Sequence, residues 1–166
     1  TLAGHRPKSS KVHARTMAFD VVPQIGALLD SGNTEEEEKM MFETRKILGR
    51  PDLRVAATCV RVPVVRSHSE VVHVVTDRHL SVEQANAVLD DMAGLRVTDC
   101  HQMGAYPTAV QAEGQFDTLV GRVRIDPVAP NGLIFWIVSD NLLKGAALNA
   151  VQIACAAWNQ ARNCKS

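Results

Sequence analysis

The stretch CVRVPVVRSHSE, residues 59–70, has the apolar, β-branched composition of a buried strand. It nevertheless carries Arg61, Arg66 and His68. A guanidinium holds a carboxylate through two parallel hydrogen bonds, and an imidazole exchanges protons near neutral pH. Arg61 and His68 together therefore suit an anionic substrate that undergoes acid–base chemistry. In the structural alternative, Arg61 pairs with an aspartate and His68 caps a turn. Arg66 is assigned by default to a solvent-exposed turn.

Whether Arg61 and His68 can share a site depends on how the chain runs between them. In one straight strand they would lie about 23 Å apart, at about 3.3 Å per residue. If residues 53–64 and 68–76 instead form a hairpin, Arg61 lies opposite His68 with Cβ atoms about 5 Å apart. A wide loop over residues 63–67 would make that turn. The hairpin would place a fixed cation beside a titratable base.

Residues 34–48 give the clearest helical signal. Thr34 is the predicted N-cap, and Glu37 follows at the position that a capping box requires. Glu36 and Lys39 are three residues apart and so share one face of this helix. Directed at a pocket, they could hold an ammonium group and a phosphate. The alternative is that the carboxylate run is an ordinary solvated face.

The remaining elements follow from apolar patterning. Residues 17–32 are expected to form a loop followed by a short helical piece. Strands are expected over residues 53–64, 68–77, 95–100, 119–127 and 132–140, helices over 81–94 and 140–163, and a loop over 101–117. The apolar run 132–140 predicts a central strand, and the Ala-rich helix 140–163 is expected to be buried on most sides. Short links between adjacent strands favour antiparallel pairing, so the predicted class is α+β.

Composition excludes several function classes. Lys plus Arg and Asp plus Glu both count 18 in 166 residues, so net charge gives no support to a nucleic-acid or membrane-surface partner. No apolar run is long enough to span a bilayer. The four cysteines show no metal-ligand spacing, which predicts no bound metal and a reduced, cytoplasmic setting. Residues 1–15 are basic and predict a linker or a phosphate-contacting arm, and residues 16–166 are expected to form one domain.

Five sequence blocks occur in order: FETRKILG, ATCVRVPVVRSHSE, YPTAVQAEG, LVGRVRIDP and IVSDNLLKGAALNAVQIA. Together they resemble the C-terminal domain of bacterial aspartate-semialdehyde dehydrogenases, from Met17 to Ala154. The resemblance implies a glyceraldehyde-3-phosphate-dehydrogenase-like C-terminal fold, with a mostly antiparallel or mixed sheet and helices packed on one face. It also implies a homodimer.

The resemblance implies a specific reaction. Enzymes of this family reduce aspartyl 4-phosphate with NADPH through a cysteine thioacyl intermediate, giving aspartate semialdehyde and phosphate on the route to lysine, methionine and threonine. In this sequence His68 matches the acid/base histidine and Arg61 the arginine that holds the substrate α-carboxylate. Glu36 matches the glutamate near the amino group, and Lys39 the phosphate-site lysine. Asn141 matches an asparagine that contacts the NADP cofactor.

The family's N-terminal half has no counterpart in this sequence. None of the ten glycines belongs to a GxGxxG turn, and the nucleophile motif is not found. Cys164, in RNCKS, is expected to be a surface thiol. We therefore expect the NADP-binding domain to be absent and the chain alone to be inactive. Because the last helix normally packs on that domain, residues 142–158 are expected to expose an apolar face.

Three alternatives stay open at the level of sequence. The chain could be a stand-alone, non-catalytic dimerisation paralogue that kept the fold. It could belong to a related acyl-phosphate reductase that acts on a glutamyl substrate. A basic-arm nucleic-acid binder acting through residues 5–15 is the third alternative.

Overall fold

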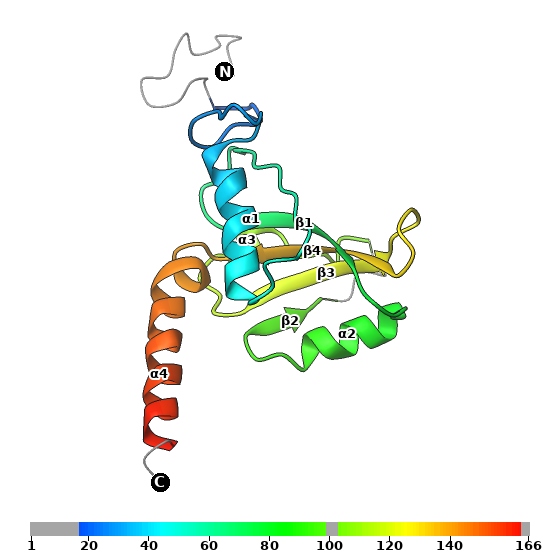
Figure 1. Ribbon diagram of the computed structural model, residues 1–166, viewed down its shortest axis with the longest axis vertical. Helices are drawn as coiled ribbons and strands as arrows, with labels where there is room; N and C mark the ends of the chain where they lie inside the picture. The colour runs from blue at the N-terminus through cyan, green and yellow to red at the C-terminus, as the bar shows by residue number, and fades with distance from the viewer. Residues whose placement is uncertain (1–16, 99–102, 164–166) are drawn as a thin grey trace. The chain divides into compact units, whose positions relative to one another are not determined.

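A computed structural model describes residues 17–98 and 103–163, drawn in colour in Figure 1. The expectations for residues 1–15 and for Cys164 lie outside this part of the chain. The structure contains two compact units, one that ends at Pro63 and another that begins at Val64.

The first unit is organised by helix α1, Glu35–Ile47. The Thr34 hydroxyl accepts a hydrogen bond from the Glu37 N–H, and the Glu37 carboxylate accepts one from the Thr34 N–H at 2.7 Å. This reciprocal pair is the predicted capping box, and it satisfies two N–H groups that the first helical turn leaves without intrahelical partners. After α1, Gly49 takes the left-handed conformation with φ of 62°. The predicted helix 34–48 is therefore confirmed.

Two other predictions for this unit are wrong. Residues 53–64 form no named strand, and their backbone pairing is one antiparallel bridge between Arg61 and Val22. The Cys59 N–H bonds the Glu37 carboxylate instead of a neighbouring strand, and Pro63 has no N–H to continue a ladder. The expected helical piece within residues 17–32 does not form, because its N–H groups at Val22, Gln24, Leu29 and Gly32 bond nearby loop carbonyls or the Arg61 carbonyl.

The second unit contains a four-stranded mixed sheet (Figure 1). Its strands are β1 His68–Val75, β2 Leu95–Val97, β3 Thr118–Ile125 and β4 Gly132–Ser139, in the order β1-β4-β3-β2. Strand β4 pairs antiparallel with both β1 and β3, whereas β2 pairs parallel with β3. The continuous apolar run of β4 thus lies inside the sheet, as predicted.

The predicted hairpin between residues 53–64 and 68–76 is wrong. Strand β1 pairs with β4, which places Ser139 opposite His68, while the backbone partner of Arg61 is Val22. The pairing of β1 with β4 matches apolar residues across the strands, with Val71 opposite Trp136. This long-range match prevails over a local hairpin whose turn sequence was unfavourable.

Helices cover part of this sheet. Helix α2, Val82–Asp90, has the predicted Ser81 cap and packs against β2 and β3. Helix α3, Ala109–Ala112, packs against β4 and lies inside the segment predicted to be a loop. Its start carries a capping box of Thr108 and Gln111, a signal that the sequence interpretation missed.

One buried apolar cluster of the second unit lies between α3 and the sheet. It contains Ala112, Leu119 and Val138, with Trp136 packed against them. The Trp136 indole N–H donates to the Pro107 carbonyl at 2.8 Å, so this large, partly buried side chain has its polar atom satisfied. The core therefore fixes α3 and the segment before it onto β4.

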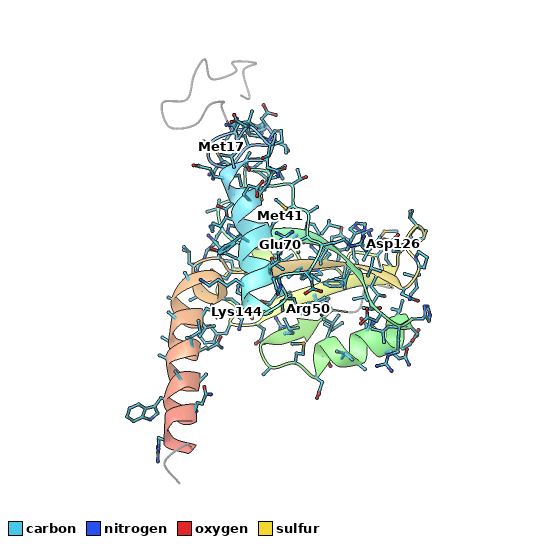
Figure 2. All side chains as sticks on the ribbon, viewed as in Figure 1. Met17, Met41, Arg50, Glu70, Asp126 and Lys144 are labelled. Carbon is cyan, nitrogen blue, oxygen red and sulfur yellow. The ribbon has the colours of Figure 1, made fainter. Side chains whose placement is uncertain are left out.

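The chain ends in a π-helical turn η1, Leu143–Ala147, that continues into helix α4, Leu148–Asn163. Figure 2 shows the side chains of α4 as sticks, and Val151, Ile153 and Trp158 are 58%, 61% and 67% exposed. The expectation that this helix is buried on most sides is wrong for the described chain, because nothing covers these residues there. Val151 and Trp158 lie on one side of α4 and give it an exposed apolar strip, whereas Ile153 lies on the opposite side, so the expected apolar face is present in part. Among the described residues, no helix has the length and apolar character needed to cross a membrane.

Candidate functional site

In the first unit, Glu36 and Lys39 lie on one face of α1, as predicted. The Lys39 Nζ donates to both carboxylate oxygens of Glu36, at 3.0 and 3.1 Å. This hydrogen bond, together with the negative charge of Glu36, raises the pKa of Lys39. The lysine is therefore a cation at neutral pH. Since both side chains are partly exposed, the pair can exchange its internal bond for contacts to a phosphate and an ammonium group.

The Arg61 backbone is fixed in the same unit. Its N–H donates to the Val22 carbonyl at 2.8 Å, and its carbonyl accepts from the Val22 N–H at 3.0 Å. Two residues earlier, the Cys59 N–H donates to the Glu37 carboxylate at 2.8 Å. Residues 59–61 are thus held by α1 on one side and by Val22 on the other. The Arg61 side chain, which is half-buried, extends from a backbone with defined geometry.

In the second unit, His68 is the first residue of β1 and its side chain is exposed. The residue before it, Ser67, is 4% exposed and has a φ of 80°. The Ser67 N–H donates to the Asn141 Oδ1 at 2.8 Å, and the Ser67 hydroxyl donates to the Ala109 carbonyl at 3.0 Å. The structure therefore brings His68 and Asn141, two of the predicted site residues, to the same end of the sheet.

A buried aspartate lies directly beside Asn141. The Asp140 side chain has no exposed surface, and its Oδ2 receives the Arg66 guanidinium and the Gly114 N–H, both at 2.7 Å. Its Oδ1 accepts from the N–H groups of Leu142 at 2.9 Å and Leu143 at 3.2 Å. Burial by itself raises the pKa of Asp140, but these hydrogen bonds outweigh it and hold the pKa at about 2. Asp140 is therefore ionised at neutral pH.

Arg66 does not occupy the solvent-exposed turn that the sequence interpretation assigned to it. Its side chain is 27% exposed and forms the ion pair with Asp140. No local pattern indicated this partner, because Arg66 precedes β1 and Asp140 follows β4, far apart in the sequence, and only the antiparallel pairing of the two strands brings them to the same end of the sheet. The available signal was an aspartate placed directly after a continuous apolar strand, a position where a buried charge needs a partner.

The end of the sheet that carries His68 is distinct from the end that carries the β3–β4 turn. Figure 2 labels Glu70 toward the first end and Asp126 toward the second. At the second end, Asp126 lies 3.3 Å from His73 and also accepts from the Val128 N–H. Within the described residues, no group of three His, Cys, Asp or Glu side chains is arranged to hold a metal ion.

Comparison with known proteins identifies the family. The family model described as semialdehyde dehydrogenase, dimerisation domain, matches residues 1–144. The chain belongs to the semialdehyde dehydrogenase dimerisation-domain family. All five predicted site residues of this family member lie within the matched region: Glu36, Lys39, Arg61, His68 and Asn141.

Similar proteins of this family are larger than the chain. The chain is 45% identical over 148 residues to the aspartate-semialdehyde dehydrogenase of Aquifex aeolicus, covering 89% of the chain and 43% of that enzyme. The crystal structure of aspartate semialdehyde dehydrogenase II from Vibrio cholerae superposes with a TM-score of 0.86 at 42% identity. A second structure of that protein, complexed with ASA, gives a TM-score of 0.85. Each Vibrio match covers 92% of this chain and 45% of the solved one.

These matches confirm the predicted fold class. The mixed sheet with its helices is the fold of the solved aspartate semialdehyde dehydrogenase structures, over nearly the whole chain. The family membership agrees with the resemblance drawn from the five sequence blocks. The chain spans less than half the length of the relatives it matches.

Proposed function

We propose that this chain is the substrate-binding and dimerisation domain of an aspartate-semialdehyde dehydrogenase. The enzyme would convert aspartyl 4-phosphate, NADPH and a proton into aspartate semialdehyde, phosphate and NADP. The observation that carries the proposal is the 42% identity, at a TM-score of 0.85, to a Vibrio cholerae enzyme solved with ASA. Because of this similarity, aspartate semialdehyde is the first substrate to test.

The proposed roles follow the chemistry of the side chains. Arg61 would hold the substrate α-carboxylate, because a guanidinium offers two parallel donors to a carboxylate. His68 would move the proton at the reacting carbon, which its exposed position at the start of β1 permits. Glu36 would hold the substrate ammonium group and Lys39 the phosphate. The salt bridge between Glu36 and Lys39 supports both of these roles, since it places the two charged groups side by side on one partly exposed face of α1.

Asn141 is the residue of this chain proposed to contact the NADP cofactor, whose reduced form, NADPH, supplies the hydride when bound. Its Oδ1 already accepts from the Ser67 N–H, and this bond fixes the orientation of the amide. The Nδ2 amino group is therefore the part of Asn141 that would donate to an acceptor on the cofactor. The Asn141 side chain is half-buried and its oxygen is already hydrogen-bonded, which fits a contact made through the amino group.

The proposal includes the partners of this domain. The enzyme would be a homodimer in the cytoplasm and would act in the biosynthesis of lysine, methionine and threonine. The cofactor turn and the cysteine nucleophile would lie in a second domain that covers the apolar face of α4. The exposed Val151 and Trp158, which share one side of α4, support this arrangement, since exposed apolar surface of this kind is typical of an interface.

The test is a domain replacement in the Vibrio cholerae enzyme. This chain replaces the matched part of that protein, and the oxidation of aspartate semialdehyde by NADP and phosphate is followed through NADPH absorbance. We expect turnover with aspartate semialdehyde and little with glutamate semialdehyde, whereas the chain alone should show none. A second replacement, with the matched region of the Aquifex aeolicus enzyme, shows whether the scaffold accepts such a domain. An active Aquifex replacement beside an inactive replacement with this chain would contradict the proposal.

A further inference from the structure

We infer that Arg66 and Asp140 are positioning residues, which hold His68 and Asn141 in one rigid arrangement at the end of the sheet. The inference rests on the proposed function, because that function assigns His68 to proton transfer and Asn141 to the cofactor. Neither Arg66 nor Asp140 needs to touch the substrate for this role. Each lies within two residues of a proposed site residue in the sequence.

The Asp140 carboxylate joins three separate segments of the second unit. One oxygen receives Arg66 from the segment before β1 and the Gly114 N–H from the segment after α3. The other oxygen receives the N–H groups of Leu142 and Leu143, at the start of the final helical region. All four contacts are 3.2 Å or shorter, and the carboxylate is fully buried. Movement of any of these segments would therefore remove at least one of the contacts that compensate a buried charge.

Ser67 links the position of His68 to the hydrogen-bonded segments around Asp140. Its φ of 80° is uncommon for a residue with a side chain, and such a conformation persists only where the surroundings determine it. Here the surroundings are the Asn141 amide, which accepts the Ser67 N–H, and the Ala109 carbonyl, which accepts its hydroxyl. The turn at Ser67 sets the direction in which the chain enters β1. It thereby sets the position of the His68 side chain.

The cost of burying Arg66 favours a positioning role over a purely stabilising one. A buried ion pair is often no more stabilising than apolar residues of the same size. The Arg66 Nε is moreover buried without a hydrogen-bond partner among the described residues. An unpaired buried donor lowers stability, so the pair is not optimised for stability alone. What it does provide is a fixed register between the segments that carry His68 and Asn141.

The experiment compares Arg66→Lys and Asp140→Asn in the active domain replacement and in the 166-residue chain. Lysine keeps the charge of Arg66 but loses the planar fork, and asparagine keeps the shape of Asp140 but loses its charge. We expect kcat to fall by about 10- to 100-fold, since a misplacement of about 1 Å can cost that much, with the KM for aspartate semialdehyde nearly unchanged. The limb of the pH profile that belongs to His68 should also move.

The matched control is the exposed ion pair of Arg50 with Asp52, at 2.8 Å in the first unit. Asp52→Asn removes a carboxylate whose pKa is also lowered to about 2, chiefly by its hydrogen bond to Arg50, but which is exposed. We expect no change in kcat or in the pH profile for this variant. A fall equal to that of Asp140→Asn would overturn the inference, because the effect would then not depend on the His68 end of the sheet.

NMR spectra of the chain separate this inference from the proposed function. The imidazole signals of His68 and the side-chain amide signals of Asn141 should shift in Arg66→Lys, whether or not any enzyme activity is found. If Asp140→Asn does not fold, Arg66→Lys alone decides the outcome. Unchanged His68 and Asn141 signals, or a kcat within about twofold of the parent, would overturn the positioning role. An inactive parent replacement beside shifted signals would contradict the proposed function instead.

Discussion

The carboxylate of Glu37 accepts a hydrogen bond from the Cys59 N–H, 22 positions later in the chain, at 2.8 Å. Its other oxygen accepts from the Thr34 N–H at 2.7 Å. One side chain thus caps α1 and also holds the segment that leads to Arg61. Glu37 is only 7% exposed, and the backbone bonds from Thr34 and Cys59 lower its pKa. The predicted capping residue has a second role that its local sequence did not indicate.

The pH dependence of unfolding should reveal how much ionised Glu37 contributes to the stability of the first unit. Because its folded-state pKa lies below the ordinary value of 4.5, ionised Glu37 stabilises the first unit above that pH. This contribution is lost as the pH falls below that value toward the lowered pKa. We expect Glu37→Gln to be less stable at neutral pH and to lose less stability on acidification, measured by urea unfolding. Glu43→Gln, on the exposed side of α1, is the control. Equal acid sensitivity of Glu37→Gln and the parent would contradict this assignment.

Removal of the N-cap hydroxyl gives a prediction for α1 alone. Thr34 is 2% exposed and its hydroxyl accepts the Glu37 N–H. Thr34→Ala should lower the free energy of unfolding by about 1 kcal/mol, the usual cost of losing a threonine cap. Thr34→Ser keeps the acceptor and should lose much less. Hydrogen exchange of the first-turn amides measures both variants, and equal protection in them would rule out the capping role.

The core of the second unit gives a larger stability effect. Leu119 is 3% exposed and belongs to the buried cluster with Ala112 and Val138. Leu119→Ala should lower the free energy of unfolding by about 2–5 kcal/mol, because a cavity adds to the lost apolar burial. Val128→Ala, at a residue that is 87% exposed, should change it by less than about 0.5 kcal/mol. Thermal unfolding followed by near-UV circular dichroism of Trp136 compares the two, and similar values would contradict the assignment of the core.

Substitution of the two proposed substrate residues should separate binding from proton transfer. In the active domain replacement, Arg61→Lys should raise the KM for aspartate semialdehyde by about 10- to 100-fold, since a charged hydrogen bond contributes about 1.5–3 kcal/mol. His68→Asn should instead lower kcat by about 10²- to 10⁴-fold. Arg54→Lys, an exposed arginine near Arg61 in the sequence, is the control. An unchanged KM in the Arg61→Lys variant would show that Arg61 does not hold the substrate α-carboxylate.

The exposed face of α4 leads to a prediction about association. Val151 and Trp158 are 58% and 67% exposed, so changing both to lysine should alter the stability of the chain by less than about 0.5 kcal/mol per site. The same double variant should reduce self-association of the chain, measured by sedimentation equilibrium. In the domain replacement it should lower thermal stability, because the face would be covered there. No effect in the domain replacement would show that α4 does not face the second domain.

Short-range patterns in the chain were enough to predict the local features of this protein. Thr34 with Glu37, and Ser81 with Gln84, indicated where α1 and α2 begin, because a capping box involves residues only three positions apart. The apolar run of β4 indicated an interior strand for a similar reason, since burial on both faces leaves no polar alternation. The five sequence blocks were also sufficient for the family, which the comparisons then established.

Which distant segments meet became visible only in the folded chain. The sequence interpretation paired residues 53–64 with 68–76, whereas β1 pairs with β4. It likewise left Arg66 in solvent, although its partner is the buried Asp140. Ser67 and Asn141 are 74 positions apart, and their hydrogen bond exists only because the pairing of β1 with β4 brings the two strand ends together. Contacts of this kind depend on strand register, which is set by packing across the whole sheet and not by neighbours in the chain.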